Sequence, residues 1–330
     1  MIATLPADLA ADLRAAIEGL PGAAVAVGRL ARGAMTVDVV AGRGASRDPE
    51  RVFQIGSVGK TVTATLLADA VRRGEVRLDE PLDAFLPPGV RAPSFRGRAI
   101  TLEHLATHRS GLPALPANFD LSAPDPFARY DRAKLFAFLN AYELPCAPGV
   151  QYEYSNAGYG LLGLLLAERA GTTYAALARE RVFAPLGMAS TSAGPGNDPR
   201  LLPGYDESGR RVPPWRFDVL AGAGAVTSTA RDMLLYAAAQ LPGADGPLAA
   251  AARLAHAPRA DCPQGRIGLA WSVAPDGTLW HNGGTNGFRS MLALAPRTRS
   301  AAVLLANADV SAGLLESAAI LLLAPSRQEP

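Results

Sequence analysis

The chain has 330 residues, and 49% of them are hydrophobic, which is enough to bury the core of one large domain or of two lobes. Its formal net charge is only +2, and its lysines and arginines form no block, so the composition indicates neither nucleic acid nor an anionic membrane as a partner. These values favour a globular protein that acts on a small molecule.

Neither end of the sequence has the pattern of an export signal or a membrane anchor. Asp8, Asp12 and Glu18 interrupt the first segment, where a signal needs a basic stretch followed by an apolar one. The longest apolar run near the end, 314–324, contains Glu316 and is too short to cross a bilayer. We therefore expect a cytoplasmic protein without a membrane span, although a periplasmic or secreted protein whose signal had been removed would look the same. The oligomeric state is left open.

The first 56 residues are predicted to form a helix and a β-hairpin. Leu5 to Leu20 has the spacing of an amphipathic helix, which Pro21 and Gly22 end. Two strand-like runs follow at 23–29 and 35–41, joined by a turn that contains Gly33.

From residue 57 to about residue 264, helical patterns alternate with loops rich in proline and glycine. Helices are expected at 57–73, 101–107, 132–141, 156–170, 173–183 and 229–241. Strand patterns then return at 268–274, 278–282, 289–295 and 301–307, and a last helix is expected at 311–323.

The first and last parts both supply antiparallel strands, and the helical part lies between them in sequence. We therefore predict an α+β fold with two lobes. Residues 1–56 and about 265–330 would form an antiparallel β-sheet flanked by the N- and C-terminal helices, and about 57–264 would form a mostly helical lobe. Residues 1–330 would then make a single unit with its site between the lobes.

Ser57 lies where a short extended segment ends and the helix 57–73 begins. Its hydroxyl would be near backbone N–H groups that have no partner inside the helix, and such donors can hold an oxyanion. Lys60 follows on the same helix face, and a lysine among apolar side chains can be kept neutral enough to take a serine proton. The pair suits Ser-x-x-Lys acyl transfer, although a capping serine and a solvated lysine would give the same short pattern.

Two later segments carry side chains that could complete such a site. Tyr154 and Asn156 stand at the start of a glycine-rich helix, where a phenol could pass a proton and an amide could bind a substrate carbonyl. A late strand contains His281, and the glycines that follow it permit close approach of a ligand along the strand edge. The Gly284 N–H would then be a second oxyanion donor beside that of Ser57.

These segments in this order, Ser-x-x-Lys, Tyr-Ser-Asn and His-Asn-Gly, resemble the serine β-lactamase and penicillin-binding protein superfamily, in particular its class C β-lactamases, DD-peptidases and related esterases. Further segments resemble it in order, between about residues 20 and 310: 105–113, 185–188, 221–224, 228–233 and 268–271. The resemblance implies a β-lactamase/transpeptidase-like fold and a serine hydrolase that forms an acyl-enzyme on an ester or amide, which could be a β-lactam, a D-amino-acid peptide or a small ester. A penicillin-binding sensor or a scaffold of the same fold is the alternative.

The resemblance also implies a role for each residue. Ser57 would be the acylated nucleophile, Lys60 and Tyr154 would exchange its proton, Asn156 would bind the amide or carbonyl of the substrate, and His281, Asn282 and Gly283 would bind it along the strand. The family's lysine is replaced here by His281, as in some DD-peptidase and esterase relatives, and its threonine or serine is replaced by Asn282. A histidine is mostly neutral at pH 7, so His281 would anchor a carboxylate well only when protonated, which puts efficient β-lactam turnover in doubt. A neutral His281 that only hydrogen-bonds to the proton relay is the other reading.

Other chemistries fit the sequence less well. His104 and His108 have the i, i+4 spacing of a zinc helix, but a leucine replaces the necessary glutamate, so packing and a loop-anchoring hydrogen bond explain them better. Ile55 replaces the first glycine of a Gly-x-Ser-x-Gly elbow, which argues against an α/β-hydrolase. Cys146 and Cys262 match no metal spacing, and their positions leave open whether they pair. The sequence predicts neither a metal nor a cofactor.

Overall fold

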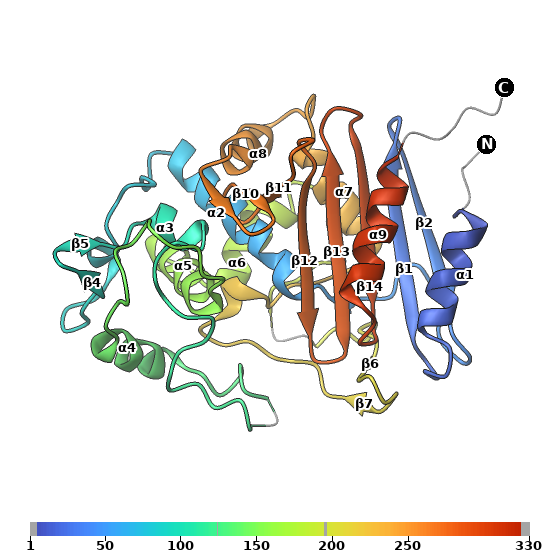
Figure 1. The fold of residues 1–330 in the computed structure, drawn as a ribbon, viewed down its shortest axis with the longest axis horizontal. Helices are drawn as coiled ribbons and strands as arrows, with labels where there is room; N and C mark the ends of the chain where they lie inside the picture. The colour runs from blue at the N-terminus through green and yellow to red at the C-terminus, as the bar shows by residue number, and fades with distance from the viewer. Residues whose placement is uncertain (1–4, 124, 195–196, 325–330) are drawn as a thin grey trace.

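The computed structural model describes residues 5–123, 125–194 and 197–324. Eight strands form one antiparallel sheet in the order β2-β1-β14-β13-β12-β11-β10-β9 (Figure 1). They are β1 (Ala24–Ala31), β2 (Ala34–Ala41), β9 (Ala260–Cys262), β10 (Gly265–Ile267), β11 (Ser272–Val273), β12 (Leu279–Thr285), β13 (Phe288–Ala295) and β14 (Ser300–Ala306). Val25 of β1 lies opposite Ala306 of β14, so the hairpin from the start of the chain joins the strands from its end.

Helices cover both faces of this sheet. They are α1 (Ala7–Ala16), α7 (Ala230–Gln240) and α9 (Ala312–Leu323). Successive side chains of a strand point to opposite faces, and in β14 Leu304 packs with α1 and α9 while Val303 and Leu305 join the core that includes α7. In Figure 1, α9 lies in front of the sheet over β13 and β14.

The helical part lies beside β12 (Figure 1). Its elements are α2 (Gly59–Arg72), α3 (Leu102–Ala106), α4 (Arg132–Ala141), α5 (Asn156–Arg169), α6 (Tyr174–Ala178), α8 (Pro247–His256), the π-helix η3 (Arg179–Phe183) and the 3₁₀ helices η1 (Gly56–Val58), η2 (Leu82–Phe85) and η4 (Ala221–Ala223). Short strand pairs accompany them: β3 (Phe53–Gln54) with β8 (Thr227–Ser228), β4 (Ser94–Phe95) with β5 (Arg98–Ala99), and β6 (Gly204–Tyr205) with β7 (Arg211–Val212). Helix α2 is buried along most of its length and packs against α5, α8 and η4, so it is the central helix of this part.

The predicted α+β fold, an antiparallel sheet flanked by the two terminal helices, is confirmed. The predicted strand 268–274 is wrong over its first half, because Ala270 adopts a left-handed φ of 66° and turns the chain before β11. The strands β9 and β10 were not predicted, since strands of three residues are too short to display a period of two, and the helix α8 was not predicted either.

Two features that the sequence left open have simple outcomes. Cys146 and Cys262 are both free thiols. Within the described ranges, every helix is too short or too polar to cross a bilayer.

Candidate active site

Ser57 lies in η1, the 3₁₀ turn that leads directly into α2, as the sequence predicts. Gly56 before it has a left-handed φ of 49°, and a Cβ at that position would lie 2.7 Å from the Gly284 carbonyl oxygen, so only glycine permits this close approach to β12. The Ser57 hydroxyl makes no capping hydrogen bond within the described chain, so the structure gives no support to the reading of Ser57 as a helix cap.

Lys60 is completely buried, and its Nζ atom lies at the centre of three oxygens. These are the Ser57 Oγ at 3.0 Å, the Asn156 Oδ1 at 2.7 Å and the Ala223 carbonyl at 2.7 Å. Burial holds the pKa of Lys60 well below its usual value. A neutral amine can donate to Asn156 and Ala223 and still present its lone pair to the serine proton. The geometry therefore suits Lys60 as the base for Ser57.

Tyr154 lies over the same lysine, with its ring centroid 4.8 Å from the Lys60 Nζ. Burial raises the pKa of Tyr154, and a hydrogen bond to Ser57 opposes that rise only in part. The phenol therefore keeps its proton while Lys60 tends to lose one. Tyr154 is thus suited to give a proton to a leaving group, and Lys60 is suited to take one from Ser57.

Asn156 is the first residue of α5 rather than its cap. Ser155 is the N-cap, because its extended backbone lets its Oγ accept the Gly158 N–H at 2.8 Å. The Asn156 Oδ1 accepts from Lys60, and none of the hydrogen bonds of the described residues uses its Nδ2. That amide nitrogen is therefore available to donate to a substrate carbonyl.

The carbonyl of Ala223 is a contact that the sequence did not reveal. It belongs to η4, which packs so closely on α5 that a Cβ at Gly163 would lie 2.7 Å from the Gly222 Cα. The glycines of α5 thereby let η4 approach Lys60. A main-chain acceptor leaves no signature in its own side chain, so only the neighbouring glycines could have pointed to it.

Strand β12 passes Ser57 with its glycines facing the nucleophile. A Cβ at Gly283 would collide with the Ile55 carbonyl and lie 3.0 Å from the Ser57 nitrogen. Thr285 pairs with Phe288 across a two-residue turn, and the alternation of an antiparallel ladder then turns the Gly284 N–H away from β13. Among the described strands β11 pairs with β12 only as far as Trp280, so the edge beyond is open to a ligand.

His281 is 6% exposed and its ring centroid lies 6.4 Å from that of Tyr154. Its Nδ1 contacts the Asn282 carbonyl at 2.5 Å, and because a carbonyl can only accept, Nδ1 carries the proton and Nε2 is left as an acceptor. Burial lowers the pKa of His281 to about 4. The side chain is therefore neutral at pH 7.

Asn282, the next residue, points to the other face of the sheet. Its Nδ2 donates to the Glu316 Oε1 of α9 at 3.0 Å. Glu316 forms no ion pair within the described chain, and it is the only charged residue of α9. The structure thus places a carboxylate beside Asn282.

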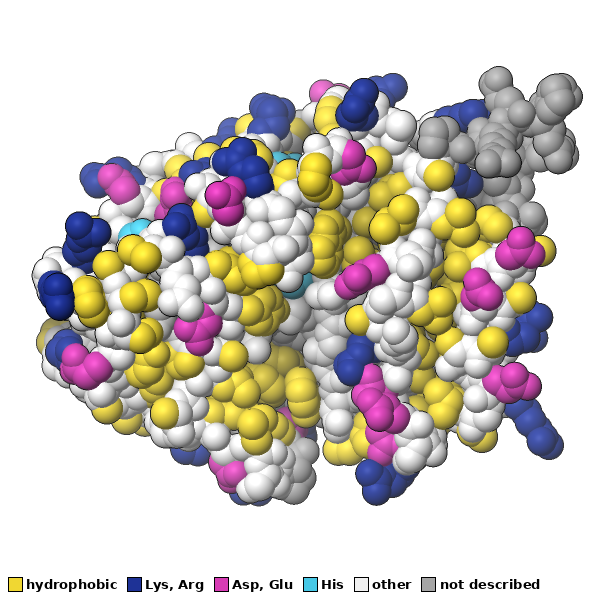
Figure 2. All heavy atoms as spheres, in the orientation of Figure 1, with side chains coloured by type: hydrophobic (Ala, Val, Ile, Leu, Met, Phe, Trp, Pro, Cys, Tyr) yellow, Lys and Arg dark blue, Asp and Glu magenta, His cyan; other side chains and the backbone are white. Residues whose placement is uncertain are grey.

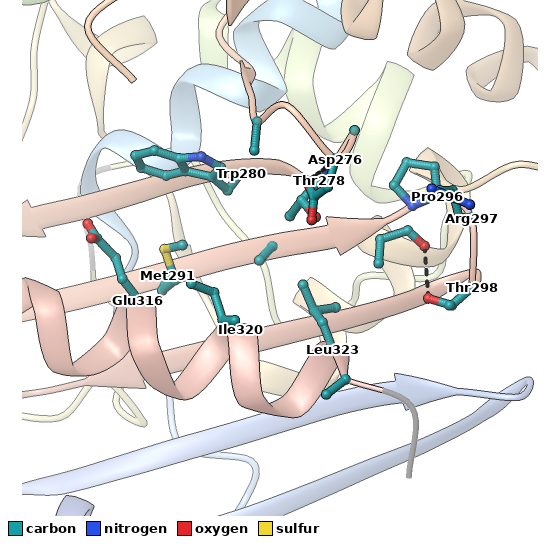
Figure 3. A pocket seen from close by; sticks show the side chains of 15 residues that line it. Asp276, Thr278, Trp280, Met291, Pro296, Arg297, Thr298, Glu316, Ile320 and Leu323 are labelled. Atoms are coloured by element: carbon teal, nitrogen blue, oxygen red, sulfur yellow. Dashed lines mark hydrogen bonds between the residues drawn. The ribbon is translucent and has the colours of Figure 1, made fainter. Parts of the chain in front are cut away.

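A groove of about 660 Å³ runs from Glu316 along α9 (Figure 3). Its walls are mostly apolar and include Trp280, Met291, Ile320 and Leu323. These side chains lie on the α9 side of the sheet, so the groove contains neither Ser57 nor Lys60. Figure 2 shows a separate hollow between the helical part and the sheet, with a histidine side chain visible in it.

The two histidines with zinc spacing serve the backbone instead. The His104 Nδ1 accepts the Thr101 N–H at 3.1 Å in a capping box, and the His108 Nδ1 accepts the Ser155 N–H at 3.0 Å. The predicted loop-anchoring hydrogen bond is therefore confirmed for His108.

The chain resembles known proteins over nearly its whole length. The family model described as Beta-lactamase matches residues 9–324. The chain is 35% identical over 190 residues to the D-alanyl-D-alanine-carboxypeptidase/endopeptidase AmpH of Escherichia coli, covering 57% of this chain and 48% of that protein. It is 33% identical over 199 residues to a beta-lactamase of the same species, covering 59% and 49%. The chain thus spans about half the length of these curated relatives.

The fold agrees with this match. A crystal structure of a class C beta lactamase from Rhodobacter sphaeroides superposes with a TM-score of 0.80 at 25% identity, covering 96% of this chain and 98% of that one. With a family model that spans 9–324 and a shared fold, the chain belongs to the beta-lactamase family.

Proposed function

We propose that this protein is a serine hydrolase that works through a covalent acyl-enzyme on Ser57. The observation that carries the proposal is the position of the Lys60 Nζ, buried and 3.0 Å from the Ser57 Oγ, with Asn156 and Ala223 occupying its other donors. A serine hydroxyl is a weak nucleophile until an adjacent base takes its proton, and this arrangement supplies that base.

Acylation would begin with attack of the Ser57 Oγ on the substrate carbonyl while its proton moves to Lys60. The N–H groups of Ser57 and Gly284 would hold the oxyanion, and the Asn156 Nδ2 would orient the acyl part of the substrate. Tyr154 would then give its proton to the leaving group and recover one from Lys60, so that in sum one proton passes from serine to the leaving group. Water would release the acyl group by the same steps in reverse, returning a proton to Ser57.

Intact-protein mass spectrometry tests this function, with activated esters and a fluorescent penicillin as probes. We expect an adduct of the acyl mass that forms and decays in the wild type and is absent in Ser57→Ala. An adduct that never decays would indicate the sensory alternative, and no adduct with any probe would contradict acyl chemistry. Ser57→Ala is a clean control, since the lost hydroxyl makes no capping bond and the melting temperature should change little.

A specific observation favours neutral esters over substrates that carry a carboxylate near the scissile bond. His281, which stands where the family has a lysine, is neutral at pH 7, so this position offers a substrate carboxylate no cation. A carboxylate bound here would lose water without gaining an ion pair. The relative AmpH is named for D-alanyl-D-alanine carboxypeptidase activity, so for this chain the comparison of the two substrate types is decisive.

A pair of p-nitrophenyl esters that differ only in a carboxylate or a carboxamide measures this preference. We expect kcat/KM to be higher for the carboxamide ester in the wild type, and Glu316→Gln to leave that difference unchanged, because Glu316 lies on the α9 side of the sheet. The amide oxygen of the introduced glutamine can still accept from Asn282, so the variant removes charge and little else. A higher kcat/KM for the carboxylate ester in the wild type would show that another group of the site binds the carboxylate.

A further inference from the structure

His108 lies in the turn after α3 and is 1% exposed, so it is one of the most deeply buried polar residues of the chain. Its backbone φ is 57°, in the left-handed region that residues other than glycine seldom adopt. Such a conformation persists only where the surroundings hold it, and it occurs frequently near functional sites. At His108 the surroundings that hold it belong to the segment around Tyr154.

Both backbone N–H groups that flank Tyr154 are held by this one residue. The His108 carbonyl accepts the Glu153 N–H at 2.7 Å, and the His108 Nδ1 accepts the Ser155 N–H at 3.0 Å. A left-handed residue can turn its carbonyl and its side chain toward the same neighbouring segment. The main chain on either side of Tyr154 is consequently fixed to His108.

The imidazole ring also supports the side chain of Tyr154. The two ring centroids lie 4.4 Å apart with an angle of 31° between the planes, and Tyr152 and Tyr159 pack on the same imidazole at 5.7 Å and 4.8 Å. Because Nδ1 accepts the hydrogen bond from the Ser155 N–H, the proton of the neutral ring is on Nε2, which is buried and has no hydrogen-bond partner in the described chain. The remaining contacts of the imidazole are its packing against these three tyrosine rings.

We propose that His108 is a positioning residue that sets the direction of the Tyr154 hydroxyl toward Ser57. The inference rests on the proposed acyl transfer, in which Tyr154 carries the proton to the leaving group. Proton transfer needs the donor within hydrogen-bond reach of its target, and small displacements of a positioned group are costly in rate. A histidine side chain supplies both an acceptor for the Ser155 N–H and a flat ring. Asparagine supplies only the acceptor, and phenylalanine supplies only the ring.

Two substitutions separate these contributions. His108→Asn keeps an acceptor for the Ser155 N–H and tolerates a left-handed backbone, but it loses the ring. His108→Phe keeps a ring and leaves the Ser155 N–H without its acceptor. We expect His108→Phe to lower kcat for a p-nitrophenyl ester by roughly tenfold to a hundredfold and His108→Asn to lower it less, with KM changed by less than about threefold.

A double-mutant cycle with Tyr154→Phe distinguishes positioning from general damage to the fold. If His108 acts through the Tyr154 hydroxyl, neither substitution lowers the rate further once that hydroxyl is gone. His104→Asn is the matched control, because its Nδ1 also accepts a backbone N–H, but that of Thr101 and not one beside Tyr154. Its effect should be small and equal in both backgrounds. An equal loss on His108 substitution in both backgrounds would overturn the proposal.

An NMR measurement that needs no catalysis tests the role of His108 independently of the proposed function. In protein labelled with ¹³C at the tyrosine ζ carbon, Tyr154→Phe assigns the Tyr154 signal. We expect that signal to shift or broaden in His108→Phe and to stay in place in His104→Asn. If it is unchanged in both His108 variants, His108 does not position Tyr154, whether or not the protein hydrolyses esters.

Discussion

Lys60 and Tyr154 have pKa values that move in opposite directions for the same reason. Burial disfavours the charged form of each group, so the lysine loses its proton more easily and the tyrosine loses its proton less easily. The Lys60 Nζ lies 3.0 Å from the Ser57 Oγ, and Tyr154 hydrogen-bonds to the same serine, so the base and the acid of one proton relay both contact the nucleophile. Such opposed shifts are a mark of paired acid and base roles.

Double-mutant kinetics test this relay. Lys60→Ala and Tyr154→Phe should each slow acylation of Ser57 by on the order of a hundredfold or more, since a positioned acid or base typically contributes that much. Because both groups handle one proton, the double mutant should be little slower than the slower single mutant. Stopped-flow labelling with an activated ester measures all four rates. Effects that multiply would show two independent functions.

The low pKa of His281 predicts that the preference for carboxylate-bearing substrates does not depend on pH near neutrality. A histidine anchor with an ordinary pKa would favour carboxylate-bearing substrates as the pH falls toward 6, but burial lowers this pKa to about 4. The ratio of kcat/KM for nitrocefin to that for a neutral p-nitrophenyl ester should therefore stay flat from pH 8 to pH 5.5. His281→Lys should raise the ratio on the order of tenfold at pH 7, as a charged hydrogen bond would. A wild-type ratio that rises between pH 7 and pH 6 would show that His281 is protonated there.

At the scale of elements, the site depends on two pairs of segments that approach each other through glycines. Gly56 and Gly283 let η1 meet β12, and Gly163 and Gly222 let α5 meet η4. In each case a Cβ would meet backbone atoms, which cannot rotate away. The backbone donors and acceptors around Ser57 and Lys60 therefore depend on close packing rather than on particular polar side chains.

Gly163→Ala tests this packing. The new methyl group would press on Gly222, so we expect the free energy of unfolding to fall by about 1 to 3 kcal/mol and acylation to slow as the Ala223 carbonyl moves from Lys60. Urea denaturation and ester labelling measure the two effects. Gly313→Ala in α9 is the control, since its Cβ would have nothing nearer than the Ser311 Oγ at 3.7 Å, and it should be neutral or slightly stabilising. Unchanged acylation in a destabilised Gly163→Ala would show that the η4 carbonyl is dispensable.

At the scale of the whole molecule, all four histidines have pKa values lowered by burial. The unfolded chain takes up these protons below pH 6.5, whereas the native protein takes up that of His281 only near pH 4. The unfolded state therefore binds more protons in this range, and stability is lost as the pH falls from about 6.5 toward 4. The slope can reach about 1.4 kcal/mol per pH unit for each deeply buried histidine.

Urea denaturation at pH 7, 6 and 5 measures this loss. We expect the wild type to lose stability at each step and His281→Asn to lose less, because one titrating group is gone. His108 is equally buried and remains in the variant, so part of the slope should persist. Equal slopes in the two proteins would contradict a low native pKa for His281.

Local patterns in the sequence were sufficient to predict the elements that carry the site. The apolar spacing after Gly56 predicted the helix that begins beside Ser57, and the strand patterns at 289–295 and 301–307 match β13 and β14 closely. Hydrophobic periodicity and glycine or proline breaks act over a few residues, so they can be read without knowledge of the fold. The resemblance of the motifs then pointed to the residues that meet at Ser57.

Other features of the site depend on contacts between distant segments. The Ala223 carbonyl lies 163 residues from Lys60 in sequence, and Glu316 lies 34 residues from Asn282, so neither partner could be inferred from spacing. The low pKa values of Lys60 and His281 arise from burial, which exists only once the helical part closes on β12. The sequence therefore determines which residue types form the relay. The protonation states of these residues depend on the packed molecule, because desolvation depends on every segment that excludes water.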